Sequence, residues 1–230
     1  IPFVLITGSL QVKFLRYLLP ITPILIIYGS QFINMIFEWS KSKNNINTIT
    51  SISIGIIIIF STLYAMAFIN IYTKPHSAVA SSNWIQQNAP IDSIILKEHW
   101  EEGLPQLNNF EIRELPMYET DNESKFRLIS NNLTEANYIV FYSHRLYGTI
   151  PRLSNRYPSS SQFYKLLFTE KLGYDLVHFE KSYPSTLGIT FIDDTFSRIN
   201  IQTPNLVTQS LKNNFSINMG FVDESFTVYD

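Results

Sequence analysis

Two long apolar stretches dominate the first third of the 230-residue sequence. The first runs from Phe14 to Phe37 and carries one charge, Arg16, near its start. The second runs from Ser51 to Ile71 and carries none. A helix of about 20 apolar residues is long enough to cross the hydrocarbon core of a bilayer. The pattern therefore predicts two transmembrane helices, with spans of about 14–37 and 51–71.

After Ile71 the pattern changes to shorter segments that alternate between helical and strand character. Apolar spacing and turn residues predict helices at 76–89, 122–133 and 159–173, and strands at 93–98, 137–143, 174–183 and 225–230. In the third helix we expect a serine N-cap and Gly173 as the C-terminal cap. Alternating helices and strands predict a small α/β domain. The fold class is thus a membrane α-helical segment, residues 1–71, followed by an α/β domain, residues 72–230.

Charge is distributed unevenly between these two parts. Up to Ile71 there are four Lys or Arg and one acidic residue, whereas from Tyr72 there are 13 basic and 18 acidic residues. An acidic domain argues against nucleic acid as a partner, because nucleic-acid binding needs a basic face. The sequence has no cysteine, which excludes disulfides, thiolate metal sites and cysteine nucleophiles. We predict no metal and no cofactor.

Lysines between the two apolar stretches indicate how the chain is oriented in the membrane. Lys41 and Lys43 lie in the segment Glu38–Thr50, and the positive-inside rule would place that segment in the cytoplasm. Everything after Ile71 would then be extracytoplasmic. Lys13 and Arg16, before the first span, weaken this charge asymmetry, so topology does not explain their presence.

Lys13, Arg16 and Tyr17 share one face of a helix, because they are spaced i, i+3, i+4. Two interpretations fit this group. Cations and tyrosines anchor helix ends among lipid headgroups. The same three side chains suit a lipid-phosphate site, with Arg and Lys as charged donors and Tyr as a hydroxyl donor.

Two loops of the α/β domain hold candidate contacts for an acceptor or glycan. His99, Trp100 and Glu101 follow the strand at 93–98, and His99 with Glu98, Glu101 and Glu102 has the residue types of an acid–base or metal site. The loop "YSHRLYGTIPRLSNRYP" adds Arg145, Tyr147 and Arg152, residue types that suit sugar hydroxyls or phosphates. The simpler interpretation is a solvated loop in the first case and a loop packed by its own tyrosines in the second.

Several stretches together resemble multi-pass GT-C glycosyltransferases of the family 39 kind, relatives of protein O-mannosyltransferases and aminoarabinose transferases. They are "VKFLRYLLPITP", "NWIQQNAPIDSIILKEHWEEGLP", "YSHRLYGTIPRLSNRYP", "LGYDLVHFEKSYPSTLGITFIDDTF" and "GFVDESFTVYD". The resemblance implies an integral protein of the prokaryotic plasma membrane. It would transfer a sugar from a polyprenyl-phosphate carrier to a glycan, lipid or protein acceptor on the extracytoplasmic side.

On this resemblance Lys13, Arg16 and Tyr17 would face the phosphate of the lipid-linked donor, and membrane lipid is a further partner. The catalytic acidic residue of such enzymes lies in a loop upstream of this sequence. We therefore assign no catalytic residue here, and we expect a C-terminal fragment that is inactive alone. The alternative is a non-enzymatic, membrane-anchored domain that binds a glycan or a partner protein. A transporter fragment is disfavoured, since neither span carries a charge at its middle.

Overall fold

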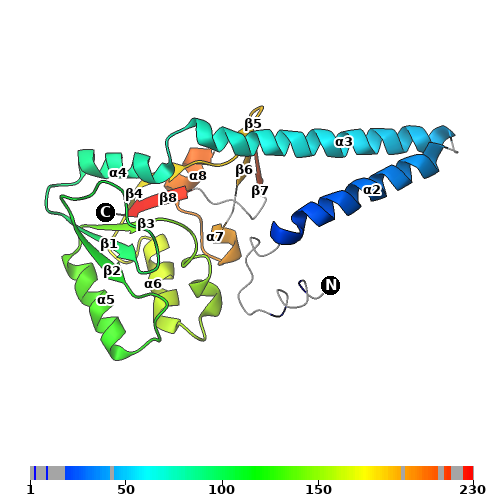
Figure 1. Cartoon of the computed structure of the whole chain (residues 1–230). Helices are drawn as coiled ribbons and strands as arrows, with labels where there is room; N and C mark the ends of the chain where they lie inside the picture. Colours follow the sequence, from blue (N-terminus) through cyan, green and yellow to red (C-terminus); the bar gives the residue numbers. More distant parts are fainter. Residues whose placement is uncertain are drawn as a thin grey trace. The chain divides into compact units, whose positions relative to one another are not determined.

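The computed structural model describes residues 3, 9, 19–41, 44–192, 195–211, 215–218 and 225–229. The chain forms two compact units, Ile1–Leu63 and Tyr64–Asp230 (Figure 1). We call the second the α/β unit. Helix α3 begins in the first unit, and its last turns, from Tyr64, belong to the α/β unit.

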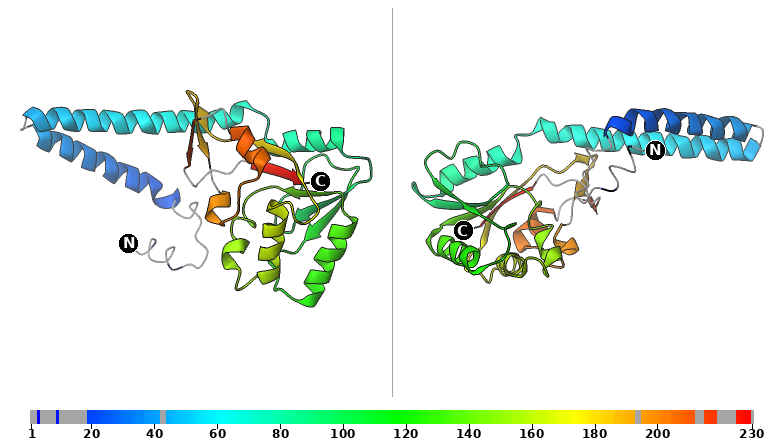
Figure 2. Two further views of the ribbon diagram at one scale, coloured as in Figure 1. Left: turned by 180° about the vertical axis from the view of Figure 1, so that it is seen from behind. Right: turned by 60° about the horizontal axis from the view of Figure 1, so that its bottom comes forward.

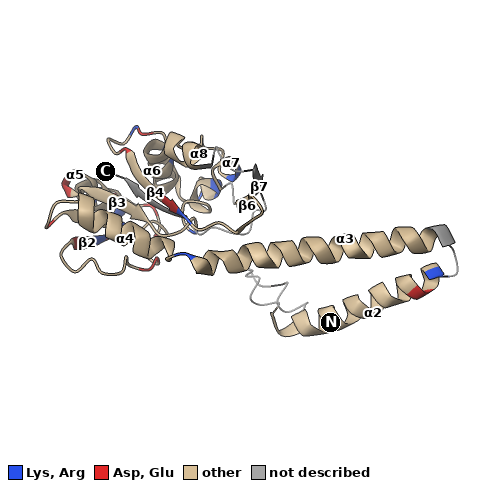
Figure 3. Cartoon of the chain, turned by 90° about the horizontal axis from the view of Figure 1, so that it is seen from above, with Lys and Arg blue, Asp and Glu red and all other residues tan. Residues whose placement is uncertain are grey.

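Two apolar helices make up the described part of the first unit, α2 (Thr22–Lys41) and α3 (Asn44–Ile69). Charged residues in them are confined to Glu38 and Lys41, near the end of α2 (Figure 3). Large side chains such as Ile26 and Ile58 are exposed. By length and composition, two helical stretches, Leu19–Lys41 and Ile46–Asn88, could cross a membrane. The prediction of two long apolar helices ahead of a small α/β region is confirmed.

The segment expected to connect these helices, Glu38–Thr50, is largely helical instead. Helix α2 continues to Lys41, whose Nζ lies 2.6 Å from Glu38 Oε1 one turn earlier, and α3 already starts at Asn44. Residues 44–50 contain no glycine or proline, so their polar character does not stop a helix.

The α/β unit contains the remaining helices and strands of the described chain. In chain order they are η2 (Asn70–Thr73), α4 (Ser77–Asn88), β1 (Ile94–Glu98), β2 (Glu111–Leu115), α5 (Glu123–Glu135), β3 (Tyr138–Phe141), η3 (Ile150–Leu153), α6 (Pro158–Phe168), β4 (Leu176–Lys181), β5 (Ser185–Thr186), β6 (Ile189–Ile192), α7 (Thr195–Arg198), α8 (Asn205–Leu211), β7 (Phe215–Asn218) and β8 (Ser225–Tyr229).

Five strands form the main sheet, in the order β2-β1-β3-β8-β4. Strand β1 is parallel to both of its neighbours, with Ile95 opposite Ile112 of β2 and Tyr138 of β3. Strand β8 is antiparallel to β3 and β4 and lies between them. The sheet is therefore parallel on one side and antiparallel on the other.

Helices cover both faces of this sheet, α4 on one and α5 with α6 on the other (Figure 2). The α4 face buries Ile85 against Ile95 and Val140 of the sheet. The opposite face buries Leu96, Ile139 and Phe141 beneath the aromatic rings of α6. Consecutive strand residues point to opposite faces, so strands covered on both sides are expected to be apolar throughout; β3 is apolar at all four positions and β1 at its first three.

Helix α6 differs at both ends from its sequence prediction. Its N-cap is Tyr157, followed by Pro158 at the first helical position, where the missing N–H is not needed. The helix ends at Phe168 with Thr169 as its C-cap, so Gly173 does not cap it. Gly173 instead adopts a positive φ of 86° in the turn before β4.

A second, three-stranded sheet, β5-β6-β7, is not among the predicted elements. Strands β5 and β6 form a tight antiparallel hairpin, and β7 is parallel to β6. The apolar run "GITFI" contains β6, and the next two residues in the sequence, Asp193 and Asp194, lie outside the described residues.

Candidate functional site

The carboxyl ends of β1 and β3 form the point where the chain changes direction in the sheet. From β1 the chain passes outward to β2, then returns through α5 to β3 on the other side of β1. The loops that follow β1 and β3 therefore start side by side and diverge. In α/β sheets such a position is the usual place for a ligand.

The loop after β1 turns sharply at Trp100. The Glu101 N–H donates to Glu98 O (3.3 Å), and Trp100 takes a positive φ of 75°, which is rare for a bulky residue. Strained backbone of this kind concentrates at functional sites. The strained conformation does not bury the indole, since Trp100 is 64 % exposed.

Glu101 connects the two loops. Its Oε2 accepts a hydrogen bond from Ser143 Oγ (3.0 Å), and its Oε1 lies 3.9 Å from Arg145 Nη1. The same Arg145 nitrogen donates to Trp100 O (3.4 Å). The structure thus brings together Trp100, Glu101 and Arg145, all predicted from sequence, and adds Ser143. We call these four residues the Glu101 cluster.

One oxygen of Glu101 has a vacant acceptor position. The Glu101 side chain is only 7 % exposed, and among the described residues Oε1 is buried and has no hydrogen-bond partner. Burial raises the pKa of the Glu101 carboxyl, whereas the Ser143 hydrogen bond and the charges of Arg145 and His144 partly offset this rise. A buried carboxylate oxygen without a donor is costly, and a ligand hydroxyl would relieve that cost.

Glycine is required in the loop after β3. The Gly148 N–H donates to His144 O (2.7 Å), and a Cβ at position 148 would lie 2.5 Å from that oxygen. No other residue permits this close approach. The tight closure fixes the backbone that carries Ser143 and Arg145.

Beneath the Glu101 cluster lies a second carboxyl, Glu98, at the end of β1. Glu98 is 1 % exposed and accepts a hydrogen bond from the Tyr164 hydroxyl of α6. Burial raises the pKa of Glu98 well above its usual range, although the Tyr164 hydrogen bond opposes this, and the nearby Glu101 adds to the rise. Burial therefore favours the neutral form of Glu98, whose hydrogen bond with Tyr164 joins β1 to α6.

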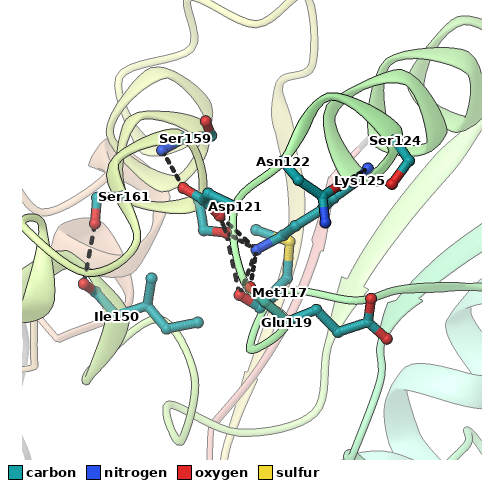
Figure 4. Close-up of polar contacts among 10 residues, drawn as sticks. Met117, Glu119, Asp121, Asn122, Ser124, Lys125, Ile150, Ser159 and Ser161 are labelled. Atoms are coloured by element: carbon teal, nitrogen blue, oxygen red, sulfur yellow. Dashed lines mark hydrogen bonds and ion pairs between the residues drawn. The ribbon is translucent and has the colours of Figure 1, made fainter.

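A buried lysine holds the start of α6 in place (Figure 4). Lys125, with 2 % of its side chain exposed, has four oxygens within hydrogen-bond distance of its three Nζ–H donors: Met117 O (3.0 Å), Glu119 O (2.7 Å), Asp121 Oδ1 (2.7 Å) and Ser160 Oγ (2.7 Å). This network ties α5, the loop after β2 and the first turn of α6 together, so it positions the helix that carries Tyr164.

Asp121 completes this network from the other side (Figure 4). Its Oδ2 accepts from the backbone N–H of Ser159 in the first turn of α6 (2.6 Å). Partial burial opposes ionisation, but the hydrogen bonds from Lys125 and Ser159 prevail and lower the pKa of Asp121. A carboxylate at a helix N-terminus also interacts favourably with the helix dipole.

Other predicted site residues lie apart from the Glu101 cluster. His99 turns toward β2, where its Nδ1 is 2.5 Å from Glu114 Oε2. Tyr147 is 3 % exposed and packs among the rings of Phe141, Phe168 and Phe196 in the core. Arg152 is exposed on η3, a different element.

Lys13, Arg16 and Tyr17 lie outside the described residues, so the predicted phosphate site stays a prediction.

Sequence reasoning included Glu98 in the group at the strand end but missed Ser143 and Tyr164 as members of the site. Ser143 stands at the end of an apolar strand, which is the signal that could have found it. Tyr164 gave no such signal, because an aromatic residue inside an amphipathic helix reads as core. Its partnership with Glu98 depends on residues 66 positions apart.

The site is shallow. A hollow of about 10 Å³ beside it, lined by residues including Lys97, Glu101, Glu102 and Tyr142, has room for about one water molecule. In the described part of the chain, no group of three or more His, Asp or Glu could hold a metal ion. No protein-family profile, curated protein or solved structure matches this chain.

Proposed function

We propose that this chain is the C-terminal part of an integral-membrane glycosyltransferase. The protein would transfer a sugar from a polyprenyl-phosphate carrier to an acceptor on the extracytoplasmic side of a prokaryotic plasma membrane. In this proposal the α/β unit lies outside and contacts the acceptor or its glycan at the Glu101 cluster. The group that performs the chemistry belongs to a part of the protein upstream of this sequence.

Membrane insertion is supported by the surfaces of α2 and α3. Their isoleucines and phenylalanines are exposed along both helices, for example Ile27 at 57 % and Phe60 at 69 %. Helices of a water-soluble protein bury such residues, whereas lipid tails solvate them. Both helices are also long enough to span a bilayer.

The observation that carries the proposal is the vacant acceptor at Glu101 Oε1, beside an exposed indole and an exposed guanidinium. A sugar presents hydroxyls that donate and accept together with C–H faces that pack on aromatic rings. A hydroxyl could donate to Glu101 Oε1 and accept from Arg145, while the ring rests on Trp100. Arg145 Nη1 lies 3.9 Å from this oxygen, and because the Arg145 side chain is 55 % exposed it can turn outward when a ligand enters.

At the donor side, Lys13 and Arg16 would contact the carrier phosphate. Cations there would stabilise the negative charge that develops on the phosphate as the sugar leaves. This assignment rests on the sequence resemblance, which places these residues at the entrance of the first span.

The test uses the full-length protein in nanodiscs with radiolabelled polyprenyl-phosphate hexose as the donor. We expect Glu101→Gln and Arg145→Ala to weaken the use of acceptor about tenfold, as loss of one charged hydrogen bond implies. Lys13→Ala combined with Arg16→Ala should weaken donor binding instead. The matched control is Arg127→Ala, since Arg127 is also an exposed arginine paired with a glutamate but lies on α5.

Two results would count against the proposal. Unchanged acceptor use in Glu101→Gln and Arg145→Ala would remove the α/β unit from acceptor binding. Unchanged donor affinity in the doubly substituted Lys13 and Arg16 variant would remove the phosphate contact. If the full-length protein transfers no sugar from any polyprenyl-phosphate donor, the enzyme assignment itself fails.

The shallowness of the site favours a second candidate, a membrane-anchored domain that binds a glycan or a partner protein without catalysis. A ligand bound at a shallow site contacts the protein through one of its sides only, as when a protein recognises the end of a glycan chain or the surface of a partner protein. This function predicts glycan binding that Arg145→Ala abolishes in a protein without transferase activity.

A further inference from the structure

The β5–β6 hairpin is fastened to the end of the apolar helix α3 at two points. The ring of Phe191 on β6 packs edge-on against Tyr64 of α3, with 5.2 Å between ring centroids and an interplanar angle of 83°. Just beyond α3, Asn70 Nδ2 donates to Ser185 O at 3.0 Å and lies 3.2 Å from Ser185 Oγ. All four residues belong to the α/β unit.

The hairpin turn carries a leucine where the fold does not favour one. Thr186 and Ile189 pair directly, so Leu187 and Gly188 form a two-residue turn, with φ of 49° and 80°. Asparagine followed by glycine is the preferred sequence for such a turn. A leucine in this conformation is unfavourable, because its Cβ lies too close to the following carbonyl oxygen. Leu187 is also 83 % exposed, so packing within the chain does not offset that cost.

Further apolar and aromatic side chains are exposed where the chain leaves α3. Ile69 is 65 % exposed and Tyr72 of η2 is 79 % exposed. Lys74 is the first residue after η2. Burial lowers the pKa of Lys181, and the nearby charge of Lys74 lowers it further. Exposed apolar side chains, a tyrosine and lysines are together typical of a protein surface that lies at a membrane interface.

We infer that the Leu187–Gly188 turn, with Ile69, Tyr72 and Lys74, forms a bilayer contact through which the α/β unit rests on the lipid surface. Leu187 would enter the boundary between headgroups and acyl chains, Tyr72 would lie among the headgroups, and Lys74 would meet lipid phosphates. A lipid bilayer is favoured over a protein partner because this contact continues from the end of an apolar helix of membrane-spanning length. The inference rests on the membrane insertion in the proposed function and is independent of glycosyl transfer.

The absence of cysteine makes a direct test simple. Leu187→Cys and, as a control, Ile91→Cys would each be labelled with the fluorophore NBD in the full chain, in nanodiscs of anionic lipid. Ile91 is a similarly exposed apolar residue, at 79 %, in the loop between α4 and β1. Lipids with a nitroxide on the acyl chain should quench the label at 187 about threefold more than that at 91, because interfacial groups lie roughly 5–10 Å deep.

Equal quenching at the two positions in a membrane-inserted chain would overturn the inference. Disulfide-linked dimers formed through Leu187→Cys would also overturn it, since the turn would then contact a second copy. Extraction of the chain from membranes by alkaline carbonate would instead show that the helices do not insert, which is a failure of the proposed function. Leu187→Asn provides a second variant that suits the turn and should lose lipid contact without loss of folding.

Discussion

Two acidic residues near the carboxyl end of β1, Glu98 and Glu101, have pKa values that burial raises, and the rise is larger for Glu98. Glu98 is buried against Tyr164, whereas Glu101 lies beside Ser143 and Arg145. Neighbouring acids with perturbed pKa values often mark functional sites. Here Glu98 serves structure, because its hydrogen bond joins the strand to α6, and Glu101 is the acid with an unused acceptor oxygen among the described residues.

We predict that Glu98→Gln alters the pH dependence of stability. The folded chain keeps Glu98 protonated, whereas in the unfolded chain this residue ionises above pH ~4.3. The free energy of unfolding of the natural protein should therefore fall as pH rises from that value toward the raised folded pKa, with a slope of at most ~1.4 kcal/mol per pH unit. Glutamine does not ionise, so Glu98→Gln should not show this fall in the free energy of unfolding.

The measurement is thermal unfolding of the full chain in detergent between about pH 4.5 and 8.5, the range in which Glu98 is ionised in the unfolded chain. Glu98→Gln should gain stability over the natural protein toward the alkaline end. Glu123→Gln, a change at an exposed carboxylate of α5, serves as the control. Parallel curves for the natural protein and Glu98→Gln would show that Glu98 does not titrate as described.

At the scale of elements, the second sheet depends on α3 for much of its support. Its hairpin is short, β5 having two residues and β6 four, and a short two-stranded hairpin is marginal alone. The Tyr64–Phe191 contact and the Asn70–Ser185 hydrogen bond supply outside support. The end of α3 is therefore a structural part of the α/β unit.

We predict that Tyr64→Ala loosens strand β6. An edge-to-face aromatic pair contributes about 1 kcal/mol, so amide hydrogen exchange of Ile189–Ile192 should speed up about fivefold. Phe191→Ala should do the same, and the double variant should add little to either single one. Tyr28→Ala on α2, an exposed tyrosine, is the control. Additive effects in the double variant would mean that the rings do not interact.

Sequence patterns predicted the elements whose neighbours are close in the chain. Helices α4 and α5 follow from local signals, since His76 and Asn122 cap them and Pro90 follows the first. Strand β2 was missed, because "EIREL" is exposed at most positions and lacks an apolar run. The small sheet and the Glu98–Tyr164 pair were also missed, since they depend on partners distant in sequence. Three of the four residues of the Glu101 cluster were predicted from the sequence, which could not show that they lie close together.

For the whole molecule, helix lengths and charge set the orientation that we expect in a membrane. Lys41 ends α2 and Lys43 follows it in the sequence, whereas the α/β unit is acidic, with 18 acidic and 13 basic residues from Tyr72 onward. Positive residues between two spans favour the cytoplasmic side. The proposed extracytoplasmic site depends on this orientation.

We predict that positions 41 and 91 lie on opposite sides of the membrane. Lys41→Cys and Ile91→Cys would be treated in intact cells with a membrane-impermeant maleimide. The label should react at 91 and should reach 41 only after the cells are opened. Reaction at both positions in intact cells would contradict the two-span topology and would move the proposed site to the wrong side for a lipid-linked donor.

Strand β8 comes after every other described element in the chain, yet it lies in the middle of the main sheet, between β3 and β4. A chain exported across a membrane as it is synthesised delivers its segments in order. Until β8 arrives, β3 and β4 would each present an unpaired edge, and the parallel and antiparallel parts of the sheet could not join. In the proposed topology, in which the α/β unit is exported, its completion is thus a late event in biogenesis, and until then the unpaired edges of β3 and β4 could pair with a strand of another chain.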